Sequence, residues 1–338
     1  MPPFSTPSTV LILGANGRFG MAAAKAFDAA GWQVLAQVRR DAAAGMPVRA
    51  ELVRAPLDAV SAALAVRTGS ASPPSVVVHA VNPIYTRWEA EALPAARAGM
   101  AIAEALDARF LLPGNVYNYG ETMPAVIDEE TPQRPSTSKG RIRAEMEGEL
   151  ETRAGAGRLR SVVITAGDFF GAGSGSWLDL AIATPIAKGR IDYPGDPALM
   201  HAWAYLPDLA RAFVAIASVP ASAPFQRFTF AGHSVTGQTF IDAVETAAAS
   251  LGLAPAKGWR YGRMPWPLIR TVGLVVPMWR ELARMSYLWR VPHALDGRRL
   301  EAAVGPLQST SLGDAMVRAL RDLGLGAPAA SVAVRRPT

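Results

Sequence analysis

Cysteine is absent from this chain of 338 residues. Its absence excludes disulfide bonds, thiolate metal ligands and cysteine nucleophiles, and it suits a reducing compartment such as the cytoplasm. Histidine is scarce as well, with four in the whole chain, and His201, His233 and His293 are scattered along the sequence. Such spacing does not indicate a metal site. We therefore predict a cytoplasmic protein that holds no metal.

Long apolar runs are also lacking. Met1 to Ser5 show neither a basic segment nor an apolar one, so we expect no signal peptide. The apolar stretch 264–285 is interrupted by three prolines and several arginines, which is unfavourable for a membrane span. The net charge is +6, but the arginines are scattered rather than clustered. We expect a small-molecule substrate, with neither nucleic acid nor membrane as a partner, and a basic surface that favours phosphorylated ligands.

Half of the residues are hydrophobic, which is enough for a large buried core. Short apolar runs typical of buried strands alternate with stretches of helical spacing. The expected strands are 9–13, 33–38, 75–80, 109–112 and 161–165, and the expected helices are 19–30, 89–106 and 141–152. This alternation predicts an α/β protein with a Rossmann-type, doubly wound parallel sheet.

The composition changes after Gly171. Residues 171–176 are rich in glycine and serine, and six of the eight tryptophans follow them. We therefore expect residues 1–175 to form the dinucleotide-binding domain, with a return segment around 200–232. Residues 176–199 and 233–338 are then expected to form a smaller C-terminal lobe that binds substrate.

A glycine-rich turn joins the first expected strand to the first expected helix. Gly14 permits a tight turn, Gly17 lets the backbone approach a pyrophosphate, and Gly20 lets the helix pack closely on the strand. The helix start offers unpaired N–H groups and partial positive charge to phosphates. The motif predicts a dinucleotide site, and the residues assigned to it are Gly14, Asn16, Gly17, Arg18, Phe19 and Gly20.

The end of the second expected strand bears on the type of dinucleotide. NAD sites usually place an acid there for the ribose 2′-hydroxyl, whereas arginine suits a 2′-phosphate. This chain has Arg39 and Arg40, with no acid before Asp41. The pair favours NADP, with Arg18 as a further cation, and NAD remains the alternative.

Several segments, taken in their order along the chain, resemble those of an extended, atypical short-chain dehydrogenase/reductase of the NAD(P)-dependent epimerase/dehydratase family. They are Gly14–Gly20, Val78–Ala80, Tyr119–Gly120, Asp128–Pro132, Gly167–Gly171 and Tyr205–Ala210. The resemblance covers most of the chain. It implies cofactor contacts at His79 and Ala80, and a homodimer formed through the helices at 89–106 and 141–152.

The resemblance also implies a catalytic tyrosine and a lysine four residues later, with a serine or threonine near the fifth strand. This chain has Thr137, Arg141 and Asn115 at those three positions. A threonine hydroxyl is too weakly acidic to replace a phenol near neutral pH, and arginine does not titrate. The ordinary tyrosine-based mechanism therefore does not transfer to this sequence.

Two tyrosines and one lysine are candidate substitutes. Tyr117 or Tyr119, at the exit of the fifth strand, serves as acid/base if Lys139 or Arg141 lowers its pKa. The alternative is that both tyrosines are packing residues and that Lys139 is a solvated loop charge. The catalytic candidates are Asn115, Tyr117, Tyr119, Lys139 and Arg141.

Two functions follow from these features. The first is an NAD(P)-dependent oxidoreductase or epimerase/dehydratase-like enzyme that acts on a hydroxyl- or carbonyl-bearing small molecule, with sugar nucleotides among the candidates. The second is a catalytically inactive NADP(H)-binding sensor or regulatory protein that retains the fold. We favour the enzyme because features of the substrate lobe persist along with the glycine turn, although a fold alone does not determine chemistry.

Overall fold

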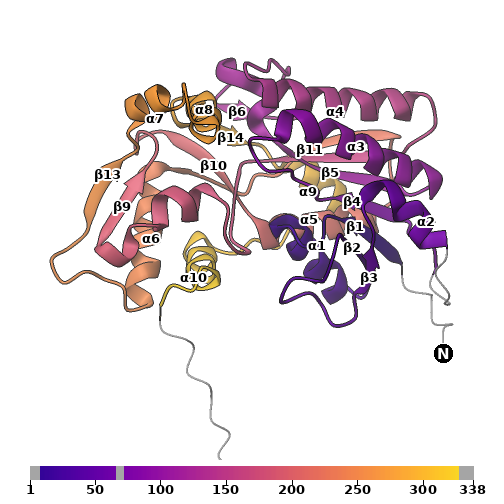
Figure 1. The fold of residues 1–338 in the computed structure, drawn as a ribbon, viewed down its shortest axis with the longest axis horizontal. Helices are drawn as coiled ribbons and strands as arrows, with labels where there is room; N and C mark the ends of the chain where they lie inside the picture. The colour runs from indigo at the N-terminus through magenta and orange to yellow at the C-terminus, as the bar shows by residue number, and fades with distance from the viewer. Residues whose placement is uncertain (1–7, 66–71, 327–338) are drawn as a thin grey trace, which may run out of the picture.

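A parallel sheet of seven strands forms the centre of the computed structural model, which describes residues 8–65 and 72–326 (Figure 1). Met1 to Ser5, in which no signal peptide is expected, lie outside the described residues. In spatial order the strands are β11 (Phe225–Thr229), β7 (Ser161–Ala166), β5 (Arg109–Asn115), β4 (Val76–His79), β1 (Thr9–Leu13), β2 (Gln33–Val38) and β3 (Glu51–Arg54). The order reverses direction between β1 and β4, and a ligand crevice in such sheets lies at this point, beyond the carboxyl ends of the strands.

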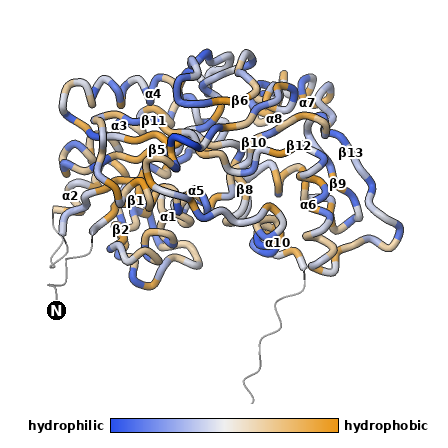
Figure 2. The backbone as a smooth tube through the Cα atoms, turned by 180° about the vertical axis from the view of Figure 1, so that it is seen from behind, coloured by the Kyte–Doolittle hydropathy of each residue, from blue (hydrophilic) through white to orange (hydrophobic). Residues whose placement is uncertain are grey.

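Helices cover both faces of this sheet. Apolar side chains of α1 (Arg18–Ala29), α5 (Leu206–Ser218) and α9 (Arg298–Val304) pack on one face. Those of α2 (Val60–Ala65), α3 (Trp88–Ala105) and α4 (Ser138–Gly155) pack on the other. Because both faces are buried, the central strands are continuous hydrophobic runs, which Figure 2 shows along β1 and β5. The doubly wound parallel sheet predicted from the alternation is confirmed.

The expected strands at 9–13 and 33–38 match β1 and β2, whereas the sheet also contains β3 and β11, which were not predicted. Both lie at the two edges of the sheet, where a strand is partly exposed and its sequence is less uniformly apolar. β11 pairs in parallel with β7, from Phe225 opposite Ser161 to Thr229 opposite Thr165. The chain thus returns to the central sheet after leaving it at β7.

The remaining elements form a second part of the molecule, which lies beside the central sheet. A three-stranded sheet has the order β12 (His233–Thr236), β10 (Met200–Tyr205) and β8 (Asp168–Phe170). Two pairs join β13 (Arg260–Arg263) to β9 (Arg190–Tyr193) and β14 (Ala294–Leu295) to β6 (Val126–Ile127). The helices of this part are α6 (Gly237–Ser250), α7 (Trp266–Val272), α8 (Pro277–Arg284) and α10 (Leu312–Asp322). No helix among the described residues is long and apolar enough to cross a membrane.

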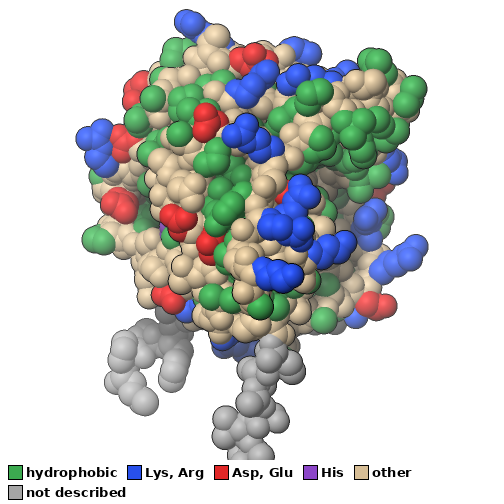
Figure 3. Space-filling view, turned by 90° about the vertical axis from the view of Figure 1, so that its left-hand side faces the viewer, with side chains coloured by type: hydrophobic (Ala, Val, Ile, Leu, Met, Phe, Trp, Pro, Cys, Tyr) green, Lys and Arg blue, Asp and Glu red, His purple; other side chains and the backbone are tan. Residues whose placement is uncertain are grey.

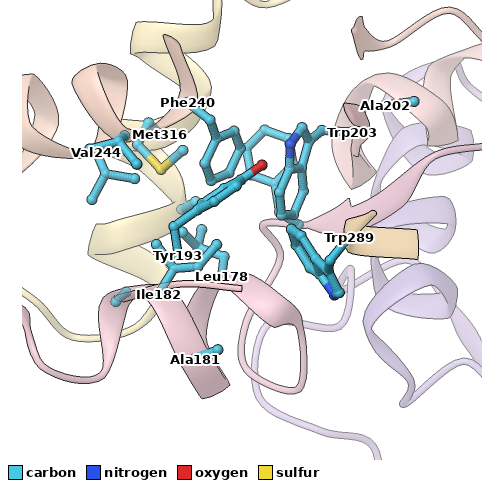
Figure 4. Packing of buried hydrophobic residues seen from close by; sticks show 14 of the residues in the cluster. Leu178, Ala181, Ile182, Tyr193, Ala202, Trp203, Phe240, Val244, Trp289 and Met316 are labelled. Carbon is cyan, nitrogen blue, oxygen red and sulfur yellow. The ribbon is translucent and has the colours of Figure 1, made fainter. Parts of the chain in front are cut away.

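An aromatic core holds this second part together (Figure 4). The Trp203 ring is stacked on Phe240 with centroids 4.0 Å apart, and Trp289 meets Tyr193 edge-on at 5.4 Å. Such aromatic pairs contribute about 0.5–1.5 kcal/mol each beyond the burial of their area. Trp203 comes from β10 and Trp289 from η5 (Ser286–Trp289), so the core joins segments that lie far apart in the sequence. This rigid cluster fixes the position of η5, which borders the candidate site.

Candidate active site

The glycine turn between β1 and α1 has the close packing that its motif predicts. Gly14 has φ of +76°, a conformation that side chains with a Cβ rarely adopt. Its N–H donates to Gln37 Oε1 at 2.8 Å. A Cβ on Gly20 would lie 2.3 Å from the Gly14 carbonyl oxygen, so the helix approaches the turn as closely as backbone atoms allow.

The first turn of α1 presents its amides without a capping group. Gly17 is the N-cap residue and supplies no side chain, and the first turn holds no acid. The Arg18 guanidinium instead donates to the Gly171 carbonyl oxygen at 3.4 Å, beyond the end of β8. Burial lowers the pKa of Arg18, and the Asp179 carboxylate opposes this effect. The helix start therefore offers N–H groups and partial positive charge to an anion.

Asn16 ties the loop after β2 to the glycine turn. Its amide nitrogen donates to the Asp41 carbonyl oxygen at 2.9 Å, and its side-chain oxygen accepts from Ala43 N–H at 2.8 Å. Arg39 and Arg40 begin that loop and are both exposed. Two guanidinium groups are thus available near the turn, and no ion pair engages either of them within residues 8–65 and 72–326.

His79 and Ala80, at the end of β4, differ in what they present to this region. The Ala80 carbonyl oxygen lies 3.6 Å from the position of a Cβ on Gly17, so its backbone borders the turn. The His79 ring points toward α3, where its Nδ1 lies 2.7 Å from the position of a Cβ on Gly99. Burial, reinforced by the Arg143 guanidinium, lowers the pKa of His79 to about 3, so the ring is neutral.

Lys139 lies at the centre of a buried polar cluster near the carboxyl ends of β4, β5 and β7. The side chain is 2% exposed, so it is not a solvated loop charge. Its ammonium group forms an ion pair with Glu281 of α8 and lies over the Tyr85 ring, 4.3 Å from the centroid. Tyr85 follows β4, and its phenol is hydrogen-bonded to that of Tyr117, which follows β5.

The pKa values of these phenols are raised, contrary to the lowering that the acid/base hypothesis required. Burial raises the pKa of Tyr117 well above its ordinary value, and Tyr85 and Asp168 reinforce the shift. Burial also raises the pKa of Tyr85, while its hydrogen bond to Tyr117 opposes the shift. Both phenols therefore keep their protons at neutral pH, so each can donate a hydrogen bond to a substrate oxygen.

Arg143 is a second inward-facing cation on α4, one turn after Lys139. Its Nη1 donates to the Pro113 carbonyl oxygen at 3.0 Å, and its guanidinium lies over the Trp88 ring at 5.2 Å. Burial lowers the pKa of Arg143, and the neighbouring Tyr117 opposes the shift. The sequence reasoning missed this residue. The spacing of four residues between Lys139 and Arg143, which places both on one helix face, was the available signal.

The structure shows where the three residues lie that differ from the pattern implied by the family resemblance. Thr137 is the N-cap of α4 and accepts from Gly140 N–H at 3.2 Å, while Arg141 on the same helix is exposed. Asn115 accepts from Tyr117 N–H at 3.1 Å, which fixes the backbone where β5 ends. Tyr119 is buried, and burial followed by the Glu147 carboxylate raises its pKa to about 12. The charged groups that influence Tyr119 differ from those that influence Tyr117 and Tyr85.

A buried carboxylate and two histidines border the same cluster. Asp168, the first residue of β8, accepts a hydrogen bond from His201 Nε2 at 2.9 Å. The His201 ring is stacked on Trp289 at 4.4 Å and meets His293 at 4.6 Å. His201 and His293, which are far apart in the sequence, therefore lie side by side, because β10 and the segment before β14 bring them together. The described part of the chain still holds no group of side chains suited to a metal ion.

The strand order 3-2-1-4-5 with the glycine turn at the switch point defines a Rossmann fold. The sequence matches the NAD dependent epimerase/dehydratase family over residues 10–228, and the chain belongs to that family. No curated protein matches the sequence.

Solved structures share the fold over nearly the whole chain. A UDP-glucose 4-epimerase from Thermotoga maritima, solved with UDP-glucose, is 14% identical with a TM-score of 0.69, covering 93% of this chain and 98% of the other. MoeE5, solved with UDP-glucuronic acid and NAD, is 19% identical with a TM-score of 0.67 and the same coverage. A UDP-Glc/GlcNAc 4-epimerase from Campylobacter jejuni is 12% identical with a TM-score of 0.68, again covering 93% and 98%. At these identities the likeness concerns the fold.

Proposed function

We propose that the chain is an NAD(P)-dependent epimerase/dehydratase-type enzyme with a non-standard active site. The observation that carries the proposal is the convergence of Tyr85, Tyr117 and Lys139 at the carboxyl edge of the sheet, the edge at which the glycine turn follows β1. Burying a lysine is costly unless the charge is paired, and here Glu281 pairs with it. A buried cation in contact with a phenol ring, at the edge of the sheet where ligands bind in such folds, is typical of a functional site.

The residues of the turn fit a dinucleotide. The uncapped start of α1 suits a diphosphate, and the absence of a Cβ at Gly17 keeps the approach to the amides open. We propose NADP(H) as the cofactor, because the exposed Arg39 and Arg40 suit a 2′-phosphate and no acid ends β2. A bound nicotinamide would supply or accept the hydride.

The proposed roles of the side chains follow from their protonation. Tyr117 and Tyr85 donate hydrogen bonds to the substrate oxygen, and Tyr117 delivers a proton when that oxygen gains charge. Lys139 supplies positive charge beside the developing negative charge in a site with little water. Asn115 keeps its amide N–H₂ group for the substrate, since its oxygen accepts from Tyr117 N–H. Sugar nucleotides are the proposed substrate class, in keeping with the ligands of the related structures.

The test has two stages. Purified protein is first titrated with NADPH and NADH, and saturable binding with a preference for NADPH is expected. Turnover is then screened with UDP-sugars and simple carbonyl compounds, and Tyr117→Phe is expected to lower kcat by about 10²-fold or more, the usual contribution of a positioned proton donor. Tyr119→Phe is the matched control, since Tyr119 is influenced by a different set of charges.

A sensor is the second candidate function. It is favoured by Thr137, which caps α4 where the family resemblance implies the catalytic tyrosine. Saturable NADPH binding without turnover of any substrate would support the sensor and reject the enzyme. Absence of binding to either reduced coenzyme would reject both.

A further inference from the structure

The hairpin formed by α7 and α8 exposes a hydrophobic tip that packs against nothing in the structure. Leu274 and Val275, in the turn between the two helices, are 77% and 78% exposed. Leu268, Val276 and Met278 add three more exposed apolar side chains on the adjoining turns. In Figure 1 the hairpin forms one corner of the molecule, at the opposite end from α2 and β3. A contiguous exposed apolar surface of this kind marks an interaction site.

The hairpin is a fixed structure rather than a loose loop. The Arg280 guanidinium donates to the Gly273 and Leu274 carbonyl oxygens at 3.0 and 3.2 Å, which closes the carboxyl end of α7. A Cβ on Gly273 would lie 3.0 Å from Arg280 Cα, so the two helices pack closely. The tip is therefore held in a defined position. Because its apolar side chains stay in water, they contribute no hydrophobic free energy to folding.

The segment of the chain that contains the tip carries almost entirely positive charge. Residues 251–290 contain one acidic residue, Glu281, which is buried against Lys139. The same stretch contains seven exposed basic residues, namely Lys257, Arg260, Arg263, Arg270, Arg280, Arg284 and Arg290. Figure 3 shows the side of the molecule that lies at the left of Figure 1. Hydrophobic side chains gather at the upper right of this view, with Lys and Arg side chains beside them. Arg263 and Arg270 have no ion-pair partner in the part of the chain that the structure describes.

We propose that the α7–α8 hairpin docks the protein on an anionic lipid surface. The apolar tip enters the boundary between headgroups and acyl chains, the arginines contact the anionic headgroups, and the half-buried Trp279 lies at the interface. A protein partner would require complementary acidic and apolar groups in register, whereas a lipid surface needs only an apolar tip with a basic margin. The proposed association is peripheral, because no described helix is suited to span a bilayer. It departs from the expectation, drawn from the sequence, that no membrane is a partner, because that expectation considered membrane spans and clustered charge but not an exposed apolar tip.

The hairpin also connects this surface with the candidate active site. Glu281 lies on α8, facing the cluster opposite the tip, and its partner Lys139 belongs to α4. A docked protein would therefore hold the candidate active site close to the membrane surface. The docking proposal itself does not depend on the proposed function, since it is tested without cofactor or substrate.

The experiment is co-sedimentation of the full chain with vesicles of phosphatidylcholine alone or mixed with phosphatidylglycerol, at low and high KCl. We expect binding to the anionic vesicles, weakened by salt, and little binding to the neutral ones. Leu274→Asp with Val275→Asp should reduce binding about tenfold or more. Arg263→Gln and Arg270→Gln should each reduce it about fivefold. The control is Val48→Asp, at a fully exposed apolar residue between β2 and β3, and it should bind as the wild type does.

Three results would overturn the proposal. The first is equal binding of the wild type to both kinds of vesicle, or to neither. The second is unchanged vesicle binding by the folded tip variant, with folding checked by circular dichroism. The third is a shift from dimer to monomer in the tip variant, measured by light scattering, while vesicle binding is unchanged. That last result would assign the tip to contact with a second copy of the chain.

Discussion

Replacing Glu281 with leucine is expected to destabilise the protein far more than the loss of a surface ion pair would. The Lys139 side chain is 2% exposed and that of Glu281 is 11% exposed, so neither charge is well solvated in the folded state. The other partner of Glu281, Arg284, is half exposed and returns to water without cost. The substitution therefore leaves the Lys139 ammonium group buried, with the Tyr85 ring as its nearest compensating group.

The expected magnitude follows from measurements on other buried pairs. Removing one member of such a pair costs about 3–5 kcal/mol, because the remaining charge is buried without compensation. The entropy of unfolding of a chain of 338 residues is about 0.7 kcal/mol/K near its melting temperature. The predicted fall in Tm is therefore about 4–7 °C. The double variant Lys139→Met with Glu281→Leu removes both charges and should lie within about 1 kcal/mol of the wild type.

The assay is thermal and urea unfolding of the wild type, both single variants, the double variant and a control. Glu145→Leu is the control, because its ion pair with Arg97 is 3.2 Å long and both side chains are about half exposed. Its loss should cost less than about 1 kcal/mol. A Glu281→Leu variant as stable as this control would show that Lys139 is not a buried charge. A double variant that loses the sum of the two single losses would show that the two residues are not coupled.

Gly20→Ala should lower the free energy of unfolding by about 1–3 kcal/mol and weaken NADPH binding, since its Cβ would lie 2.3 Å from the Gly14 carbonyl oxygen. The control is Gly148→Ala in α4, where the space around the Cβ is open, and it should stabilise the protein by about 0.5–1 kcal/mol. Because the pKa of His79 is about 3 when folded and about 6.5 when unfolded, the unfolded chain binds the extra proton first as pH falls. Stability contributed by His79 is therefore complete above pH 6.5 and is lost between 6.5 and 3 by about 1.4 kcal/mol per pH unit. Unfolding of His79→Leu between pH 7 and 4 should show a shallower slope, and an unchanged slope would contradict the assignment. Arg39→Asp should shift the ratio of NADPH to NADH affinity toward NADH in a binding titration, and a constant ratio would remove the 2′-phosphate argument.

The central sheet was largely predictable because its signals are local. A strand buried on both faces must be a continuous apolar run, so β1 and β2 were identified with their boundaries. The edge strands β3 and β11 were missed for the opposite reason, since partial exposure relaxes the demand for apolar residues. The predicted helix extends back to Ser138 because Thr137 caps it, and the sequence analysis considered Thr137 only as the position of the family's tyrosine.

The glycine turn could also be predicted from the sequence, whereas the neighbours of Lys139 could not. Sequence spacing identified Lys139 and Tyr117 as candidates but left open whether the lysine was solvated. Tyr85 and Glu281 were missed, because Glu281 lies 142 residues from Lys139 and no local pattern relates them.

By itself the sequence determined the class of fold and the position of the glycine turn, because both depend on local patterns, namely the alternation of strands and helices and the residues of one strand–turn–helix unit. The tertiary structure alone decided that Lys139 faces inward, that the phenols beside it retain their protons, and that the α7–α8 tip faces outward. Each of these depends on desolvation by segments distant in the chain, and desolvation is a property of the packed molecule rather than of any stretch of sequence.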